Sequence, residues 1–127
     1  MLILFSQHPL SRSVRATAML LTLGIVVSLF VGGAQPVAVN LIPEPWDKFA
    51  HGAIFALLAW TIGVASGLPG KRRLVVALLG SLLVGMLDEW HQMYLPGRQA
   101  GWLDLAADVS GSLIGTALLA IERIRRS

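Results

Sequence analysis

The chain has 127 residues, which is enough for one domain of ordinary size. Hydrophobic residues make up 55% of it and charged residues only 13%, whereas a soluble domain carries about a quarter charged residues. The net charge is +3, and there is no cysteine, which excludes disulfides, thiolate catalysis and cysteine-ligated metals. We therefore expect residues 1–127 to form a single domain of a small membrane protein.

Four apolar stretches come close to or exceed the length needed to cross a bilayer, which takes about 20 residues for a core about 30 Å thick. The expected spans cover residues 16–33, 47–67, 73–94 and 103–122. The third is the weakest by hydropathy, because its uninterrupted apolar run, Leu74 to Leu87, has fourteen residues. Together they predict an all-α polytopic membrane protein, with four transmembrane helices in a compact bundle.

The first stretch also has features of a secretory signal peptide, with basic residues before it and the small residues Gly32, Gly33 and Ala34 after it. It is long for the apolar region of such a peptide, so we expect a retained helix. Its lack of internal charge predicts a packing or anchoring role.

The basic residues predict the orientation of these spans. Eight of the ten Lys and Arg residues precede the first span, join the second to the third, or follow the fourth. With four crossings all three places lie on one side, and the positive-inside rule puts both termini in the cytoplasm. We expect a multi-pass protein of the bacterial inner (cytoplasmic) membrane, whose basic residues face headgroups; nucleic acid is not an expected partner.

Polar residues recur at matching depths in the last three spans. Each span carries a pair four positions apart, on one helix face: Asp47 and His51, Asp88 and Gln92, Asp104 and Asp108. The inner member of each pair lies fifteen residues, about 22 Å, from the cytoplasmic end of its span. The outer members lie about 28 Å from that end, so we expect two stacked polar layers facing outward.

Lipid cannot solvate these polar faces, so they should turn toward one another. Small residues at four-residue spacing would let the helices approach closely: Gly52 and Ala56, Ser81 and Gly85, Gly111 and Gly115. Aromatic residues gather at the outer boundary, as an interfacial belt would: Trp46, Trp90, Tyr94 and Trp102. Trp60 lies outside this belt and should pack deeper.

Three interpretations of the polar residues remain open. In the first, the pocket is catalytic: its catalytic set is His51, Asp88, Glu89 and Asp108, of which His51 and Asp88 move protons, and its substrate-binding set is Asp47, Lys48, Gln92, Arg98 and Asp104. Lys48 and Arg98 would hold an anionic headgroup, Arg98 in bidentate fashion. In the second, Asp47 and His51 share a metal ion with Asp88, Glu89 and Asp108; manganese, magnesium or zinc would suit such ligands. In the third, buried ion pairs only fix the packing.

At these residues the chain resembles the VanZ-like family of small bacterial membrane proteins. The resemblance rests on residues 47–51 (DKFAH), 88–92 (DEWHQ), Pro96-Gly97-Arg98 and 103–108 (LDLAAD), followed by Gly111 and Gly115. These motifs cover about the last two thirds of the chain, and the first span carries none of them. Where the family often has Asn, this chain has Asp108, which adds a charge.

The family is named for a protein associated with resistance to teicoplanin, a glycopeptide antibiotic, so the resemblance implies action at the cell envelope. We expect recognition, and modification, of an anionic envelope lipid or a lipid-linked cell-wall precursor. The alternatives are a non-catalytic envelope-binding protein that alters antibiotic access, and an ion- or proton-coupled carrier. The sequence does not decide whether the chain is an enzyme, which cofactor or metal it uses, or whether a second copy completes the pocket.

Overall fold

The structure is a computed structural model, which describes residues 12–35, 41–43, 46–95 and 101–125. Every regular element in these ranges is helical: α1 (Arg12–Val27), the π-helical turn η2 (Ser28–Gly32), α2 (Trp46–Ser66), α3 (Gly70–Gln92) and α4 (Trp102–Arg125). Four helices are long and apolar enough to cross a membrane, with α1 and η2 counting as one. The prediction of an all-α protein with four such helices is confirmed. Arg98 lies outside the described residues.

The helix bounds differ from the predicted spans by a few residues. α1 begins at Arg12, four residues before the apolar stretch, and α3 begins at Gly70, so that it includes Lys71 and both arginines that follow. Long basic side chains can extend their charged ends toward the interface, which allows a helix to start in polar sequence. α3 is continuous over 23 residues despite its short apolar run.

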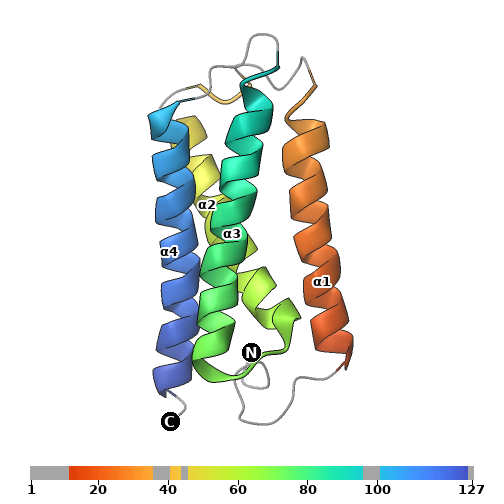
Figure 1. Ribbon diagram of the computed structural model, residues 1–127, viewed down its shortest axis with the longest axis vertical. Coiled ribbons are helices and arrows are strands. Elements are labelled where there is room, and N and C mark those ends of the chain that lie inside the picture. The colour runs from red at the N-terminus through yellow and green to blue at the C-terminus, as the bar shows by residue number, and fades with distance from the viewer. Residues whose placement is uncertain (1–11, 36–40, 44–45, 96–100, 126–127) are drawn as a thin grey trace.

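The helices run alternately up and down, so α2 begins, α3 ends and α4 begins at the same end of the bundle (Figure 1). The connection at the opposite end is tight, and glycines at both of its edges have positive φ, 67° at Gly67 and 60° at Gly70. Pro69 lies between them, just before α3, and its backbone is extended. This short link sets α2 and α3 side by side as antiparallel neighbours.

α2 and α4 approach each other most closely at small residues. A Cβ atom added to Gly111 would collide with the backbone carbonyl of Gly52, and one added to Gly115 with that of Ala56. The two glycines therefore permit backbone contact between these helices, as the spacing predicts. This contact holds the first half of α2 against α4, where the polar residues lie.

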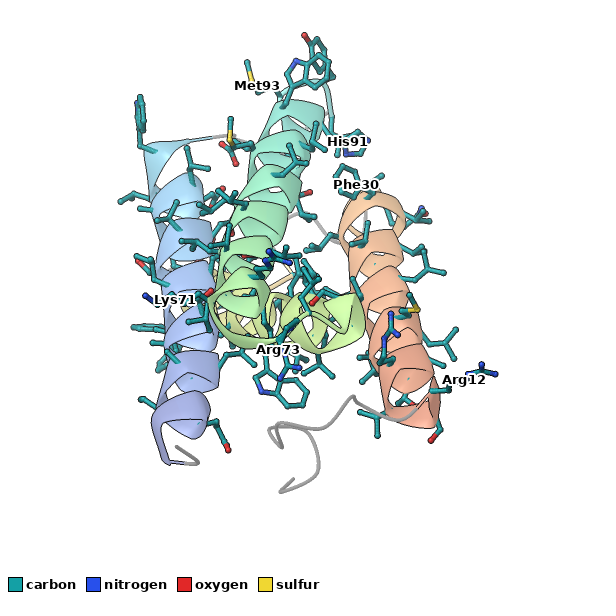
Figure 2. All side chains as sticks on the ribbon, turned by 60° about the horizontal axis from the view of Figure 1, so that its bottom comes forward. Arg12, Phe30, Lys71, Arg73, His91 and Met93 are labelled. Carbon is teal, nitrogen blue, oxygen red and sulfur yellow. The ribbon has the colours of Figure 1, made fainter. Side chains whose placement is uncertain are left out.

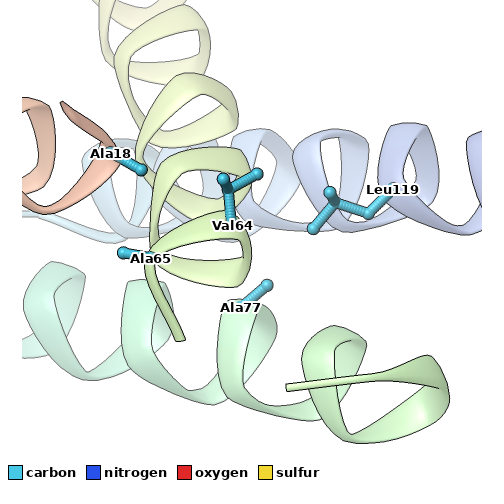
Figure 3. Packing of buried hydrophobic residues seen from close by; sticks show 5 residues of the cluster. All are labelled: Ala18, Val64, Ala65, Ala77 and Leu119. Carbon is cyan, nitrogen blue, oxygen red and sulfur yellow. The ribbon is translucent and has the colours of Figure 1, made fainter. Parts of the chain in front are cut away.

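One cluster of buried apolar residues lies toward the end of the bundle opposite the polar residues. It consists of Ala18, Val64, Ala65, Ala77 and Leu119 (Figure 3), and the half-buried Val14, Trp60 and Leu74 pack against it. Trp60 thus packs deep, in agreement with the sequence. Ala18 is the only buried residue described in α1. α1 also contacts α2 through a 3.0 Å hydrogen bond that Thr22 Oγ1 donates to Thr61 Oγ1.

Candidate functional site

Side chains from α2, α3 and α4 meet at the end of the bundle where the exposed aromatic residues also gather. Trp46 begins α2, Trp90 lies in the last turn of α3, and Trp102 begins α4; all three are exposed. We call the five carboxylates near these helix ends the acidic cluster: Asp47, Asp88, Glu89, Asp104 and Asp108. The deeper polar layer that the sequence predicts is assembled around His51.

His51 and Asp108 form a hydrogen-bonded pair between α2 and α4. His51 Nδ1 lies 2.9 Å from Asp108 Oδ1, and when this carboxylate is ionised the ring nitrogen is the donor, because an ionised carboxylate only accepts. Asp108 is 2% exposed. Gly85 of α3 makes room for it, since an added Cβ would lie 3.3 Å from the Cβ of Asp108. Phe55, one turn below, stacks on the His51 ring with centroids 6.3 Å apart.

Asp88 of α3 completes this layer and is 1% exposed. Its Oδ2 accepts a hydrogen bond of 3.3 Å from Gln92 Nε2, while its Oδ1 is buried with no hydrogen-bond partner among the described residues. One nitrogen or oxygen each from His51, Asp88 and Asp108 lie within 4.8 Å of one another. Three helices therefore converge on one point, with an imidazole and two buried carboxylates.

Lys48 occupies the outer layer between two carboxylates. Its Nζ donates to Asp47 Oδ2 at 2.7 Å and to Asp104 Oδ1 at 2.6 Å, so it links the first turns of α2 and α4. Gln92, predicted in the same layer, instead turns inward to Asp88. The engagement of Lys48 with two acids does not favour its predicted role as a clamp for an anionic headgroup.

Within the acidic cluster, Glu89 links α3 to the start of α4. Its carboxylate accepts a hydrogen bond from the backbone of Gly101 and interacts electrostatically with Asp104, Asp108 and Asp88. The hydrogen bond places the Glu89 carboxylate on the side of α3 that faces the start of α4.

His91 is a residue that the sequence reasoning left out of the site. Its ring packs against Phe30 of η2, with centroids 5.3 Å apart (Figure 2). It interacts electrostatically with Asp88, and its Nδ1 is buried without a hydrogen-bond partner among the described residues. In the sequence, the three-residue spacing of Asp88 and His91 could have indicated that His91 belongs to the site, because residues at this spacing are neighbours on one helix face. The position of η2 beside α3, which partly covers the ring, could not be read from the sequence.

An apolar groove of about 350 Å³ opens beside His91, at the same level of α3 as Asp88. Its lining comes from η2 and α3: Phe30, Leu87, Trp90, His91 and Tyr94. His91 thus lies between this groove and the acidic cluster.

Charge balance limits what the described site can attract. The acidic cluster has five carboxylates, and Lys48 is the one Lys or Arg among the described residues that forms an ion pair with them in this structure. Such an excess of negative charge favours a cationic ligand, such as a proton or a metal ion, over direct contact with an anion.

Comparison with known families decides where the chain belongs. The sequence model of the family described as VanZ/LLP1 matches residues 1–123. The chain belongs to the VanZ/LLP1 family. The match includes the first span, so the expectation that the resemblance is confined to the last two thirds of the chain is wrong. No curated protein and no solved structure matches.

Membership of VanZ/LLP1, together with four helices able to cross a bilayer, indicates a multi-pass membrane protein. The exposed apolar side chains along all four helices agree with a lipid environment, because water would not favour so large an apolar surface.

Proposed function

We propose that this protein recognises and modifies an envelope lipid headgroup, or the headgroup of a lipid-linked cell-wall precursor, at the outer face of the bacterial inner membrane. The observation that carries the proposal is the convergence of His51, Asp88 and Asp108. Ionisable groups at membrane depth are costly, and they are retained mainly where they act on a substrate, an ion or a proton.

In this proposal His51 and Asp88 move protons, while Asp108 orients the imidazole. A hydrogen-bonded carboxylate fixes which ring nitrogen carries a proton, which leaves the other nitrogen to face the substrate. The 2.9 Å contact supports this division of roles. Glu89, Asp47, Gln92 and Asp104 would surround the headgroup, and Arg98, which lies outside the described residues, stays a predicted contact of it.

The orientation is part of the proposal. Arg12, the segment 71–73 and Arg123 all belong to the end opposite the acidic cluster, which is the cytoplasmic end under the positive-inside rule. The cluster would then open outward, where wall precursors are used and where glycopeptides such as teicoplanin act.

A non-catalytic binding role is the second candidate, and the groove beside His91 is the observation that favours it. A volume of about 350 Å³ could hold part of an acyl or isoprenoid chain, with Phe30 and Trp90 in contact with it. The protein would then change antibiotic access by holding a lipid rather than by altering one.

Mass spectrometry of membrane lipids and lipid-linked precursors tests the proposal. Cells would carry the wild type, Asp88→Asn or the control Glu122→Gln at matched membrane abundance; Glu122 lies in the last turns of α4, away from the cluster. We expect a lipid species that appears or disappears with the wild type and the control, and not with Asp88→Asn. Identical profiles in all three strains would reject the modification, and a changed susceptibility to teicoplanin without a lipid change would support the binding role.

A further inference from the structure

We propose that His51, Asp88 and Asp108 bind one divalent cation of the manganese or zinc type. The starting observation is the buried Oδ1 of Asp88, which has no hydrogen-bond partner among the described residues although the side chain is 1% exposed. A buried carboxylate oxygen without a partner is unfavourable, and a cation is one of the few groups that can satisfy it.

The three side chains approach one another as metal ligands do. An octahedral ion with bonds of about 2.1 Å places neighbouring ligand atoms about 3.0 Å apart and opposite ones about 4.2 Å apart. His51 Nδ1 and Asp108 Oδ1 are 2.9 Å apart, close to the spacing of neighbouring ligands, and one nitrogen or oxygen atom from each of the three residues lies within 4.8 Å of the others. An ion bound there would replace the proton between Nδ1 and Asp108, and the imidazole would then carry its proton on Nε2.

The ligand types select the class of ion. One imidazole with two carboxylates suits manganese or zinc better than magnesium or calcium, which prefer oxygen alone. The chain has no cysteine, so soft ions such as copper(I) have no thiolate ligand. The surrounding acids, Glu89 and Asp104, add negative charge that raises affinity for a cation.

Each ligand comes from a different helix: His51 from α2, Asp88 from α3 and Asp108 from α4. The glycine contact between Gly111 and Gly52, and the space left by Gly85, bring these helices close enough for the ligands to meet. Because three protein ligands leave coordination positions open, a further ligand could bind directly to the ion.

This assignment deepens the proposed function and rests on it: with the ion bound, His51 and Asp88 hold the cation and act on the substrate through it, whereas without the ion they move protons. The acidic cluster would repel the phosphate of a lipid headgroup, whereas a bound cation would give a phosphate oxygen a direct partner. The substrate class would accordingly be a phosphate-bearing lipid.

Metal binding is measured on the purified full-length protein in detergent, after removal of metal with a chelator. Mn²⁺ or Zn²⁺ is added, and retained metal is counted by mass spectrometry after gel filtration. We expect one ion per chain for the wild type and for Glu122→Gln. Affinity should fall more than tenfold in His51→Gln, Asp88→Asn and Asp108→Asn, since even residues that only support metal ligands contribute 10- to 100-fold.

A spectroscopic measurement on the wild type covers the case in which a variant does not fold. Pulsed electron paramagnetic resonance of the Mn²⁺-loaded protein should show coupling to one imidazole nitrogen. Absence of that coupling, absence of retained metal, or equal binding by the wild type and Asp88→Asn would each overturn the cation site. A lipid species that depends on the wild type, found together with no metal binding, would leave the proposed function standing and reject only the cation.

Discussion

His51→Gln is expected to slow the wild-type-dependent lipid change by about 10²- to 10⁴-fold, the range that a positioned acid–base group contributes. Glutamine can still donate to Asp108 in place of Nδ1, and it has no group that titrates near neutral pH. The substitution therefore removes proton transfer while it keeps a polar partner for the buried carboxylate.

The rate is measured as the appearance or loss of that lipid species in cells at matched membrane abundance, with Glu122→Gln as the control on α4. Thermal unfolding of the purified proteins shows whether a slower rate comes from the loss of proton transfer or from a less stable fold. A rate within threefold of wild type would contradict an acid–base role for His51, whatever the role of Asp108.

Gly111→Leu is expected to destabilise the fold by more than about 3 kcal/mol, or to prevent α2 and α4 from packing at all. The added side chain would collide with the backbone of Gly52, which cannot move aside as a flexible side chain could. Loss of this contact would also separate His51 from Asp108, because the two lie on the same pair of helices.

The matched control is Gly24→Leu in α1, where an added Cβ meets nothing within 4 Å. Glycine is a poor helix former, so this substitution should be neutral or slightly stabilising. The free energy of unfolding in detergent, and the elution volume on gel filtration, compare the two variants. Equal stability of Gly111→Leu and wild type would show that the close contact is unnecessary.

Much of the site follows from simple geometry. The rise of an α-helix is fixed, so counting residues from the basic ends places His51, Asp88 and Asp108 at one depth, and the structure brings them together. Small residues at four-residue spacing likewise predict the approach of α4 to α2, which the contact of Gly115 with Ala56 bears out.

Other features depend on side-chain choices and helix rotation that a pattern does not specify. Lys48 could have faced a ligand, but two acids from adjacent helix starts lie closer and engage it. His91 looks interfacial beside Trp90, and its contact with Phe30 depends on the position of η2, which the sequence pattern does not specify. The extension of α1 to Arg12 reflects helix continuity beyond the apolar run.

If the acids served only to fix the packing of the helices, replacing Asp88 would destabilise the fold, whereas replacing a ligand-binding Asp88 would not. Buried ion pairs can fix the packing of a bundle, and removing one partner is then strongly destabilising. Asp88, however, has one oxygen without a hydrogen-bond partner among the described residues and forms no ion pair with Lys or Arg there. A side chain that is arranged to bind a ligand instead lowers the stability of the fold when that ligand is absent.

The most direct measurement is therefore the free energy of unfolding of Asp88→Asn against wild type, in detergent with a chelator present. Asparagine has the same shape and can still accept the hydrogen bond from Gln92, and it removes a buried charge. Stability equal to wild type or higher by up to about 2 kcal/mol is expected, because asparagine removes the charge from a buried group with one unpartnered oxygen, and an unsatisfied buried group costs more when it is charged than the about 1–3 kcal/mol of a neutral one. A loss of more than about 2 kcal/mol, on the same scale, would show that Asp88 holds the bundle together and would contradict a functional site.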